Sequence, residues 1–271
     1  MPPGGSTMHY EPERYWQDRY ARLDITSSGH RDLPEKYNRW LYRRKQAVLR
    51  RSLRRIGFEP RDKRILEVGV GIGSYLDFWQ RCGVRDITGL DLSAAAIEFL
   101  AERYPQVRFH RRDVTVPDLQ ADCGTGYDLV TALDVLYHVV DDALLDLALR
   151  NIFEVLRPGG VFALHDQFLH RPSEHHDYIV WRSLVHWEQA LTRAGFEIVH
   201  RAPIFFCMVQ PNDCATPRGA ARMDALWRRS NVLIHRLPSV AGVLGYTVDT
   251  TLAAMLDEGP SMELMLARRK A

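Results

Sequence analysis

A glycine-rich turn preceded by an acidic residue is the stretch of this sequence best suited to binding a ligand. Gly69, Gly71 and Gly73 follow a β-branched run, and Glu67 stands just ahead of them. Glycines at this spacing let the backbone turn tightly and approach a ligand, with a helix N-terminus just beyond. The dinucleotide fingerprint G-x-G-x-x-G would need glycine at position 74, where the chain has serine. The spacing is therefore wrong for NAD.

Two further acids stand where the next strands are expected to end. Asp91 closes the run "DITGLD", and Asp113 closes "VRFHRRD". The carboxyl ends of neighbouring parallel strands line one crevice, so both side chains should face the same ligand. A carboxylate at the second strand can accept both ribose hydroxyls, and one at the third can accept an amino group of adenine. Because Glu67 would repel a phosphate, the pattern predicts a nucleoside with a cationic or ammonium-bearing tail.

The elements around these residues alternate between strand-like and helix-like runs. This alternation predicts right-handed βαβ units and an α/β fold with a doubly wound, mostly parallel sheet. The turn "LRPGG" is expected just before the fifth strand. The strand-like runs lie at residues 63–69, 86–91, 107–113, 127–134, 161–166, 196–202 and 262–269.

Outside this alternation the chain predicts a helical cap. We expect an N-terminal helical cap over residues 1–58, a ligand-binding core over 59–203, a helical insertion over 204–260 that caps the acceptor, and the final strand of the core sheet over 261–271. The insertion contains two helix-like runs, "TPRGAARMDALWRRSNVLIHRL" and "TVDTTLAAMLDE". It interrupts the strand and helix rhythm of the core.

Composition and charge limit the classes of function. Because no apolar run reaches 18 residues and the start is not apolar, we expect a cytoplasmic protein without a signal peptide or a membrane partner. The four cysteines form no C-x-x-C pair and are expected to be free thiols. Residues 36–64 carry twelve Lys or Arg against two acids, a pattern that fits either a solvated helix face or a surface for an anionic partner.

Several motifs in their order along the chain carry a family resemblance. "LEVGVGIG", Asp91, Asp113, "YDLVTALDVLYHV" and "LRPGGVFALHD" together resemble the class I S-adenosylmethionine-dependent methyltransferases. The resemblance covers roughly residues 60–203, and "MELMLARR" takes the place of that family's last, antiparallel strand. It implies a Rossmann-like fold of seven strands, with S-adenosylmethionine as cofactor and S-adenosylhomocysteine as product.

The same resemblance implies a set of cofactor-binding residues. Glu67 and the three glycines would hold the methionine part, Asp91 the ribose and Asp113 the adenine region, while Asp134 would lie near the sulfonium. The full set is Glu67, Gly69, Gly71, Gly73, Asp91, Leu92, Asp113, Val114 and Asp134.

Methyl transfer needs an acceptor held in line with the methyl group, and an oxygen acceptor benefits from a base. His138, in "LDVLYHVVDD" after the fourth strand, is our first candidate for that base. A structural or cofactor-shaping role is the alternative, since the resembling family often has a histidine here. His165 and Asp166, at the end of the fifth strand, are further catalytic candidates on the acceptor side.

The segment after the fifth strand is rich in imidazoles and carboxylates. Besides His165 and Asp166 it contains His170, His175, His176 and Asp177. Their spacing matches no standard metal motif, so we expect a polar loop and no metal.

We therefore predict a methyltransferase of small molecules in biosynthesis, with a hydroxyl oxygen of a specialised metabolite or sugar as the acceptor. The alternative is carbon methylation of a prenyl diphosphate or an aromatic ring, suggested by the aromatic residues of the cap and the basic segment. A non-catalytic nucleotide- or RNA-binding protein is a third hypothesis. Nucleic acid is not the expected partner, and a homodimer is left open.

Overall fold

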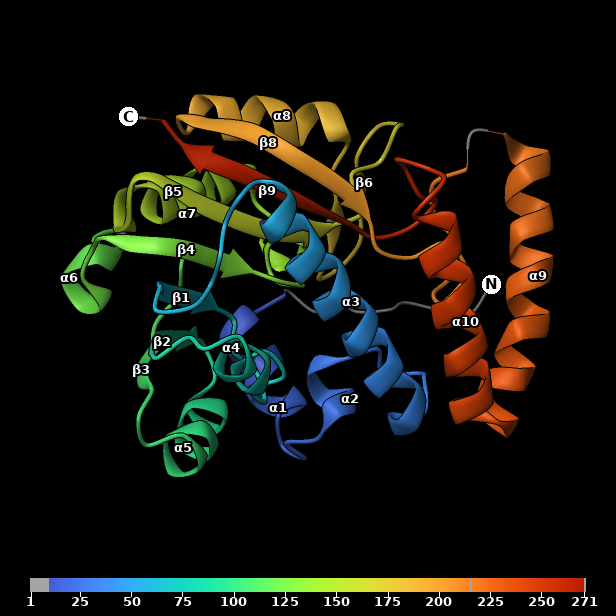
Figure 1. The fold of residues 1–271 in the computed structure, drawn as a ribbon, viewed down its shortest axis with the longest axis horizontal. Coiled ribbons are helices and arrows are strands. Elements are labelled where there is room, and N and C mark those ends of the chain that lie inside the picture. The colour runs from blue at the N-terminus through green and yellow to red at the C-terminus, as the bar shows by residue number, and fades with distance from the viewer. Residues whose placement is uncertain (1–9, 215, 271) are drawn as a thin grey trace, which may run out of the picture.

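A seven-stranded sheet forms the centre of the structure, a computed structural model that describes residues 10–214 and 216–270 (Figure 1). Its strand order is β3-β2-β1-β4-β5-β9-β8, and β9 runs antiparallel to both of its neighbours. The pairs on the other side of β5 are parallel, so the doubly wound, mostly parallel sheet expected from the sequence is confirmed. The strands are β1 Arg64–Val68, β2 Asp86–Asp91, β3 Arg108–Arg111, β4 Tyr127–Ala132, β5 Leu156–Asp166, β8 Phe196–Pro203 and β9 Glu263–Arg269.

Helices cover both faces of this sheet, and more helices extend beyond one of its ends (Figure 1). Two short strands, β6 (Glu174–His175) and β7 (Val180–Trp181), pair in the loop after β5. In the part of the chain that the structure describes, no helix is both long and apolar enough to span a membrane. The helices are α1 Pro12–Arg19, α2 Ile25–Ser28, α3 Glu35–Arg55, α4 Leu76–Arg81, α5 Ala94–Arg103, α6 Leu119–Cys123, the 3-10 helix η1 Leu136–His138, α7 Asp142–Val155, α8 Leu184–Arg193, α9 Pro217–Arg236 and α10 Pro238–Leu252.

Two hydrophobic cores hold the helices on the sheet. Successive residues of a strand point to opposite faces, and in β1 both Ile65 and Leu66 are fully buried. Ile65 packs in a core with Leu49 of α3 and Trp79 of α4. Leu66 belongs to the other core, which includes residues of α7 and α8 such as Trp187. The sheet is therefore buried on both faces, as parallel sheets require.

The fifth strand begins earlier than the sequence pattern suggested. Leu156 already pairs with Tyr127, but the register then shifts and the regular ladder resumes only where Val161 pairs with Leu129. The "RPGG" residues in between bulge, and Gly159 adopts a left-handed φ of +74°. The expected turn is thus present, but as an interruption of β5 and not as a loop before it.

The last helix also differs from its expected position. The sequence pattern predicted a helix over residues 247–258, whereas α10 runs from Pro238 to Leu252. Proline fits the first position of a helix, and α10 packs so closely on α3 that a Cβ on Gly242 would lie 2.2 Å from Cδ1 of Trp40. Packing therefore makes a helix of a stretch whose glycines argue against one. Residues 1–9, 215 and 271 of the predicted cap segments and final strand lie outside the described residues.

Candidate active site

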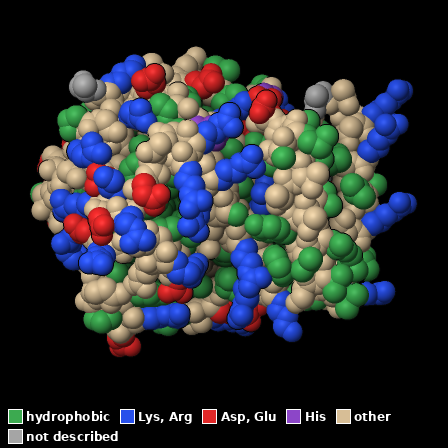
Figure 2. All heavy atoms as spheres, in the orientation of Figure 1, with side chains coloured by type: hydrophobic (Ala, Val, Ile, Leu, Met, Phe, Trp, Pro, Cys, Tyr) green, Lys and Arg blue, Asp and Glu red, His purple; other side chains and the backbone are tan. Residues whose placement is uncertain are grey.

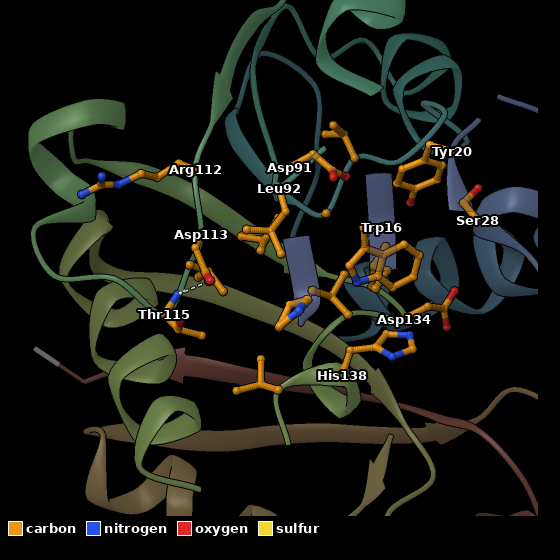
Figure 3. Close-up of a pocket in the computed structure, with 18 of the residues that line it drawn as sticks. Trp16, Tyr20, Ser28, Asp91, Leu92, Arg112, Asp113, Thr115, Asp134 and His138 are labelled. Carbon is orange, nitrogen blue, oxygen red and sulfur yellow. Dashed lines mark hydrogen bonds between the residues drawn. The ribbon is translucent and has the colours of Figure 1, made fainter. Parts of the chain in front are cut away.

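A pocket with a volume of about 480 Å³ lies at the carboxyl ends of β1, β2, β3 and β4 (Figure 3). We call it the glycine-side pocket. Part of its wall comes from the N-terminal segment, including Trp16 of α1 and Tyr20. The structure brings together in this wall seven of the residues singled out from the sequence, namely Gly69, Asp91, Leu92, Asp113, Val114, Asp134 and His138.

The glycine turn needs glycine for close approach as well as for backbone conformation. Gly69 and Gly71 have left-handed φ values of +72° and +54°. A Cβ on Gly71 would lie 2.8 Å from the Tyr20 hydroxyl oxygen and 3.1 Å from Cβ of Ser28, both of which belong to pocket-lining residues. Gly73 faces inward, where a Cβ would meet Leu100 at 2.8 Å. A side chain at position 71 would therefore push the N-terminal segment off the pocket.

Asp91 ties the end of β2 to the glycine turn. Its Oδ2 accepts the backbone N–H of Gly71 at 2.8 Å, and its Oδ1 accepts the backbone N–H of Ser93 at 2.9 Å. Burial raises the pKa of this carboxyl, while the backbone N–H groups act in the opposite direction. Each carboxylate oxygen can accept a second hydrogen bond. The side chain is thus fixed in place and keeps acceptor capacity for hydroxyls in the pocket.

Asp113 lies at another point of the same wall, after β3 (Figure 3). Its Oδ1 accepts the backbone N–H of Thr115 at 2.8 Å, which holds the loop that also carries Val114. The free carboxylate oxygen and the apolar Val114 and Leu92 side chains suit a flat ring with an amino group.

Glu67, by contrast, lies behind the pocket wall. Its carboxylate is buried and accepts the indole N–H of Trp79 at 3.0 Å. Burial raises its pKa to about 8, although the Trp79 hydrogen bond opposes the shift. The structure therefore places this residue beneath the glycine turn, where it contacts α4 and does not border the pocket.

Asp134 lies between Lys45 and His165 in a buried row of polar side chains. It follows β4 with a left-handed φ of +66°, and its Oδ2 lies 2.6 Å from the Lys45 ammonium of α3. Its other oxygen lies 3.6 Å from Nδ1 of His165. Burial alone would raise the pKa of Asp134, but the Lys45 charge and His165 outweigh it, so the pKa lies below its usual range. Asp134 is thus an anion that Lys45 already neutralises.

His138 sits in η1 among aromatic rings. Its Nδ1 lies 2.9 Å from the carbonyl oxygen of Tyr178, and its ring makes an edge contact with Trp16 at 4.8 Å between centroids. A carbonyl oxygen can only accept a hydrogen bond, so Nδ1 carries the proton and Nε2 of the neutral imidazole carries the lone pair. Burial lowers the His138 pKa to about 4. The ring is therefore neutral near pH 7 and has a free acceptor nitrogen.

His165 and Asp166, the other catalytic candidates, are fully buried in β5 and line neither the glycine-side pocket nor the second pocket described below. Burial lowers the pKa of His165 and raises that of Asp166 to about 7. His165 packs edge-on to Tyr75, and Asp166 accepts the backbone N–H of Gln167. The structure connects His165 to the pocket through Asp134 and Tyr75, both of which line it.

The remaining histidines after β5 are not gathered into a metal centre. His170 pairs with Asp213 at 2.7 Å, and His176 packs edge-on to Trp181. Within residues 10–214 and 216–270, no group of three or more His, Cys, Asp or Glu is placed to hold a metal ion.

A second pocket, with a volume of about 420 Å³, adjoins the first; we call it the cap-side pocket. Rings and polar groups from α1, α3, the loop after β5 and the segment after β8 line it, including Tyr15, Lys45, Tyr178 and Phe205. The residues that line both pockets are Trp16, Ser28, Tyr42, Asp134 and His138. Two molecules, one bound in each pocket, would therefore meet beside His138 and Asp134.

Several residues of this junction could not be singled out from the sequence. Lys45 was hidden within a run of basic residues, and only its burial beside Asp134 distinguishes it from its neighbours. Trp16 and Tyr178 were hidden among many aromatic residues. The one available signal for Lys45 is its place on the apolar face of α3, next to Leu41, Tyr42 and Leu49 at helical spacing.

Comparisons with known proteins identify methyltransferases as similar to this chain. A family model described as "Methyltransferase domain" matches residues 37–201. An mRNA cap guanine-N(7) methyltransferase of Caenorhabditis elegans is 31% identical over 36% of this chain and 30% of its own length. A ubiquinone biosynthesis O-methyltransferase of Alkalilimnicola ehrlichii is 34% identical over 36% of this chain and 39% of its own length. The chain thus spans well under half the length of these two relatives.

Among solved structures, the N-methyltransferase NodS of Bradyrhizobium japonicum in complex with S-adenosylhomocysteine has the same fold. Its TM-score is 0.53 at 16% identity, over 96% of this chain and 98% of that one.

Proposed function

This chain belongs to the S-adenosylmethionine-dependent methyltransferases, and on that premise we propose that it transfers the methyl group to a hydroxyl oxygen of a small-molecule acceptor. One observation carries the proposal: His138 lines both pockets and turns a free imidazole nitrogen away from the Tyr178 carbonyl. A neutral imidazole at the junction of the two pockets is placed to accept a hydroxyl proton.

The glycine-side pocket fits the cofactor. Its volume lies within the range typical of small-molecule sites, and Asp91 and Asp113 offer acceptors to a ribose and an adenine amino group, respectively. Hydroxyls of Tyr20, Ser28 and Ser74 line the part of the wall near the glycine turn, where a carboxylate could accept from them. When bound, S-adenosylmethionine supplies an electrophilic methyl group on a cationic sulfur.

The acceptor would lie in the cap-side pocket with its hydroxyl toward His138. There His138 Nε2 accepts the hydroxyl proton while Nδ1–H stays bonded to the Tyr178 carbonyl, which fixes the ring. Aromatic side chains from α1 and the loop after β5 hold the body of the acceptor and exclude water. Most of the rate enhancement would come from this positioning.

The low pKa of His138 bears on which class of hydroxyl could be the acceptor. Any imidazole removes a proton more readily from a phenol, with a pKa near 10, than from an alcohol, whose acidity is close to that of water at about 16, and burial makes His138 a weaker base than a free imidazole. Lys45 lines the same pocket, but its ammonium is already paired with Asp134, so a hydroxyl that is itself acidic suits this site best. We therefore favour a phenolic or enolic hydroxyl over the sugar hydroxyl considered from the sequence.

A labelling experiment tests the proposal. The purified protein is incubated with deuteromethyl-labelled S-adenosylmethionine and a panel of phenols, sugars, amines and prenyl diphosphates, and products are read by mass spectrometry. We expect label on a phenolic oxygen. Asp91→Ala should weaken cofactor binding by about 1–3 kcal/mol, because ribose hydroxyls lose their acceptor. Asp86→Ala, at the other end of β2, is the matched control. Label only on nitrogen or carbon would contradict the choice of oxygen.

Carbon methylation remains the second candidate because of the rings around His138. Tyr15, Trp16 and Tyr178 form a cluster there, and such faces stabilise a carbocation. The basic helix that suggested a prenyl diphosphate gives less support, since most of its arginines line a separate groove and only Lys45 reaches the junction. Label on a ring carbon or on a prenyl chain would select this candidate.

A further inference from the structure

The hairpin formed by α9 and α10 exposes a continuous apolar stripe. Val240, Val243, Leu244 and Val248 are between 46% and 54% exposed. Their spacing of three and four residues puts them on one side of α10. Of the twelve large hydrophobic side chains exposed within the described residues, ten lie between residues 226 and 256, so the exposed apolar surface is concentrated on the hairpin and the residues that directly follow it.

A basic groove adjoins the hairpin. It has a volume of about 670 Å³ and lies between α3 and α4, with Tyr246 of α10 on its edge. Tyr246 contacts Trp40 of α3 at 5.9 Å between ring centroids, which joins the groove to α10. Within residues 10–214 and 216–270, no carboxylate lies within 4.0 Å of its guanidinium groups. The arginines are Arg43, Arg50, Arg51, Arg54 and Arg81.

The charges of the hairpin itself have the same sign. Arg222, Arg229 and Arg236 of α9 are exposed, and the only exposed or partly exposed acid of the two helices in the described chain, Asp224, pairs with Arg228 at 2.8 Å. Asp249 of α10 is buried. Figure 2 shows Lys and Arg side chains over α3 and on the hairpin, with hydrophobic side chains between them. An apolar stripe is therefore flanked by positive charge on both sides.

We propose that this surface, the α10 stripe together with the α3 groove, binds the surface of an anionic lipid bilayer. An amphipathic helix with an apolar face and flanking arginines is suited to the boundary between headgroups and acyl chains, and each arginine near an anionic surface adds attraction. A second copy of the chain fits less well, because the arginines would face each other across a two-fold axis. RNA offers no apolar partner to the stripe.

This proposal departs from the expectation that no membrane is a partner. That expectation rested on the absence of an apolar run long enough to span a bilayer, and a helix that lies on the surface needs no such run. It also gives a role to the basic segment at residues 36–64, of which Lys45 is the one basic residue that lines a pocket of the active site.

Vesicle sedimentation with the full chain tests the proposal. Vesicles of phosphatidylcholine alone are compared with vesicles that also contain phosphatidylglycerol. We expect the protein to sediment with the anionic vesicles, and added salt to release it. Val240→Ser combined with Leu244→Ser should weaken binding about tenfold. Arg50→Glu combined with Arg54→Glu should weaken it by at least about tenfold.

Matched controls lie on the opposite face of the sheet. Val185→Ser on α8 removes a comparably exposed apolar side chain, and Arg150→Glu on α7 reverses an exposed charge. Both should bind as the unchanged protein does, and circular dichroism checks that every variant is folded. Equal sedimentation with neutral and anionic vesicles, or with neither, would overturn the proposal. So would a dimer in light scattering that the Val240→Ser and Leu244→Ser pair dissociates, or salt-sensitive RNA binding that the stripe variants leave unchanged.

Discussion

The two sides of the active site are held together in different ways. The glycine side takes Gly69, Asp91 and Asp113 from one continuous stretch of chain, and hydrogen bonds to nearby backbone N–H groups fix its carboxylates. On the cap side, Lys45 reaches Asp134 across 89 positions and His138 reaches Tyr178 across 40. The carboxylates proposed to bind the cofactor are thus held by contacts that span at most 20 positions, whereas the proposed acceptor side depends on contacts between distant segments.

Gly71→Val should produce the largest effect and tests the glycine side. The added side chain would clash with the Tyr20 hydroxyl and would strain a φ of +54°. We expect no measurable cofactor binding in titration calorimetry. Gly57→Val is the matched control, because Gly57 also has a left-handed φ of +73° but nothing within 4 Å of its added Cβ. It should lose stability and keep cofactor affinity. Normal binding by the Gly71 variant would show that the turn is more tolerant than its contacts indicate.

His138→Ala most directly separates the contribution of the cap side to turnover from that of the glycine side to cofactor binding. We expect turnover to fall by about 10²–10⁴-fold, the usual contribution of a general base, with little change in cofactor affinity. His170→Ala, which removes a half-exposed histidine paired with Asp213, is the control. Equal loss of turnover and cofactor affinity would instead assign His138 to the shape of the glycine side.

The pH dependence of turnover is a second test of His138 as the base. The base must be neutral to accept a proton, and burial lowers its pKa to about 4. The rate should therefore be independent of this group above about pH 5 and should fall as the pH drops through about 4. A falling limb centred near pH 6.5, the pKa of an unperturbed histidine, would contradict the environment described for the ring.

Lys45→Met tests how strongly the cap side depends on its long-range pair. Removing one partner leaves the Asp134 carboxylate buried without its charge partner, which we expect to cost about 3 kcal/mol in the free energy of unfolding. Urea denaturation measures this cost. Lys36→Met, an exposed lysine at the start of the same helix, should be near neutral. Equal stabilities of the two variants would show that the pair is dispensable for the fold.

More of the fold than of the site could be predicted from the sequence. Strand and helix alternation gave the mostly parallel sheet, because hydrophobic periodicity is a local property of the sequence. Two elements were placed inexactly: the start of β5 was missed at its bulge, and α10 begins and ends earlier than expected. In both, tertiary contacts outweigh local preference, since Leu156 pairs with Tyr127 and Gly242 packs against Trp40.

For the site, motif position indicated which strand end a residue occupies but not where its side chain points. Glu67 was expected to face the ligand, yet it turns under the glycine turn toward Trp79. Lys45 could not be singled out, because its role depends on a carboxylate 89 positions away. Direction and long-range pairing are set by packing, which a single sequence does not display.

Glu67→Gln should give the smallest effect, and it tests whether every acid of the glycine side serves the ligand. Burial raises the Glu67 pKa from 4.5 to about 8, so the folded protein holds a proton that the unfolded chain releases. Stability from this group is therefore present below about pH 4.5 and is lost as the pH rises toward 8, by up to about 1.4 kcal/mol per pH unit. Glutamine can still accept the Trp79 hydrogen bond but cannot ionise. Urea denaturation should therefore show a smaller decline in stability between pH 6 and pH 7 for the variant than for the unchanged protein, with cofactor affinity preserved.

The control is the exposed Glu154→Gln, which should show the same decline as the unchanged protein. A loss of cofactor affinity in Glu67→Gln without a change in this decline would return Glu67 to the ligand, as the sequence first suggested.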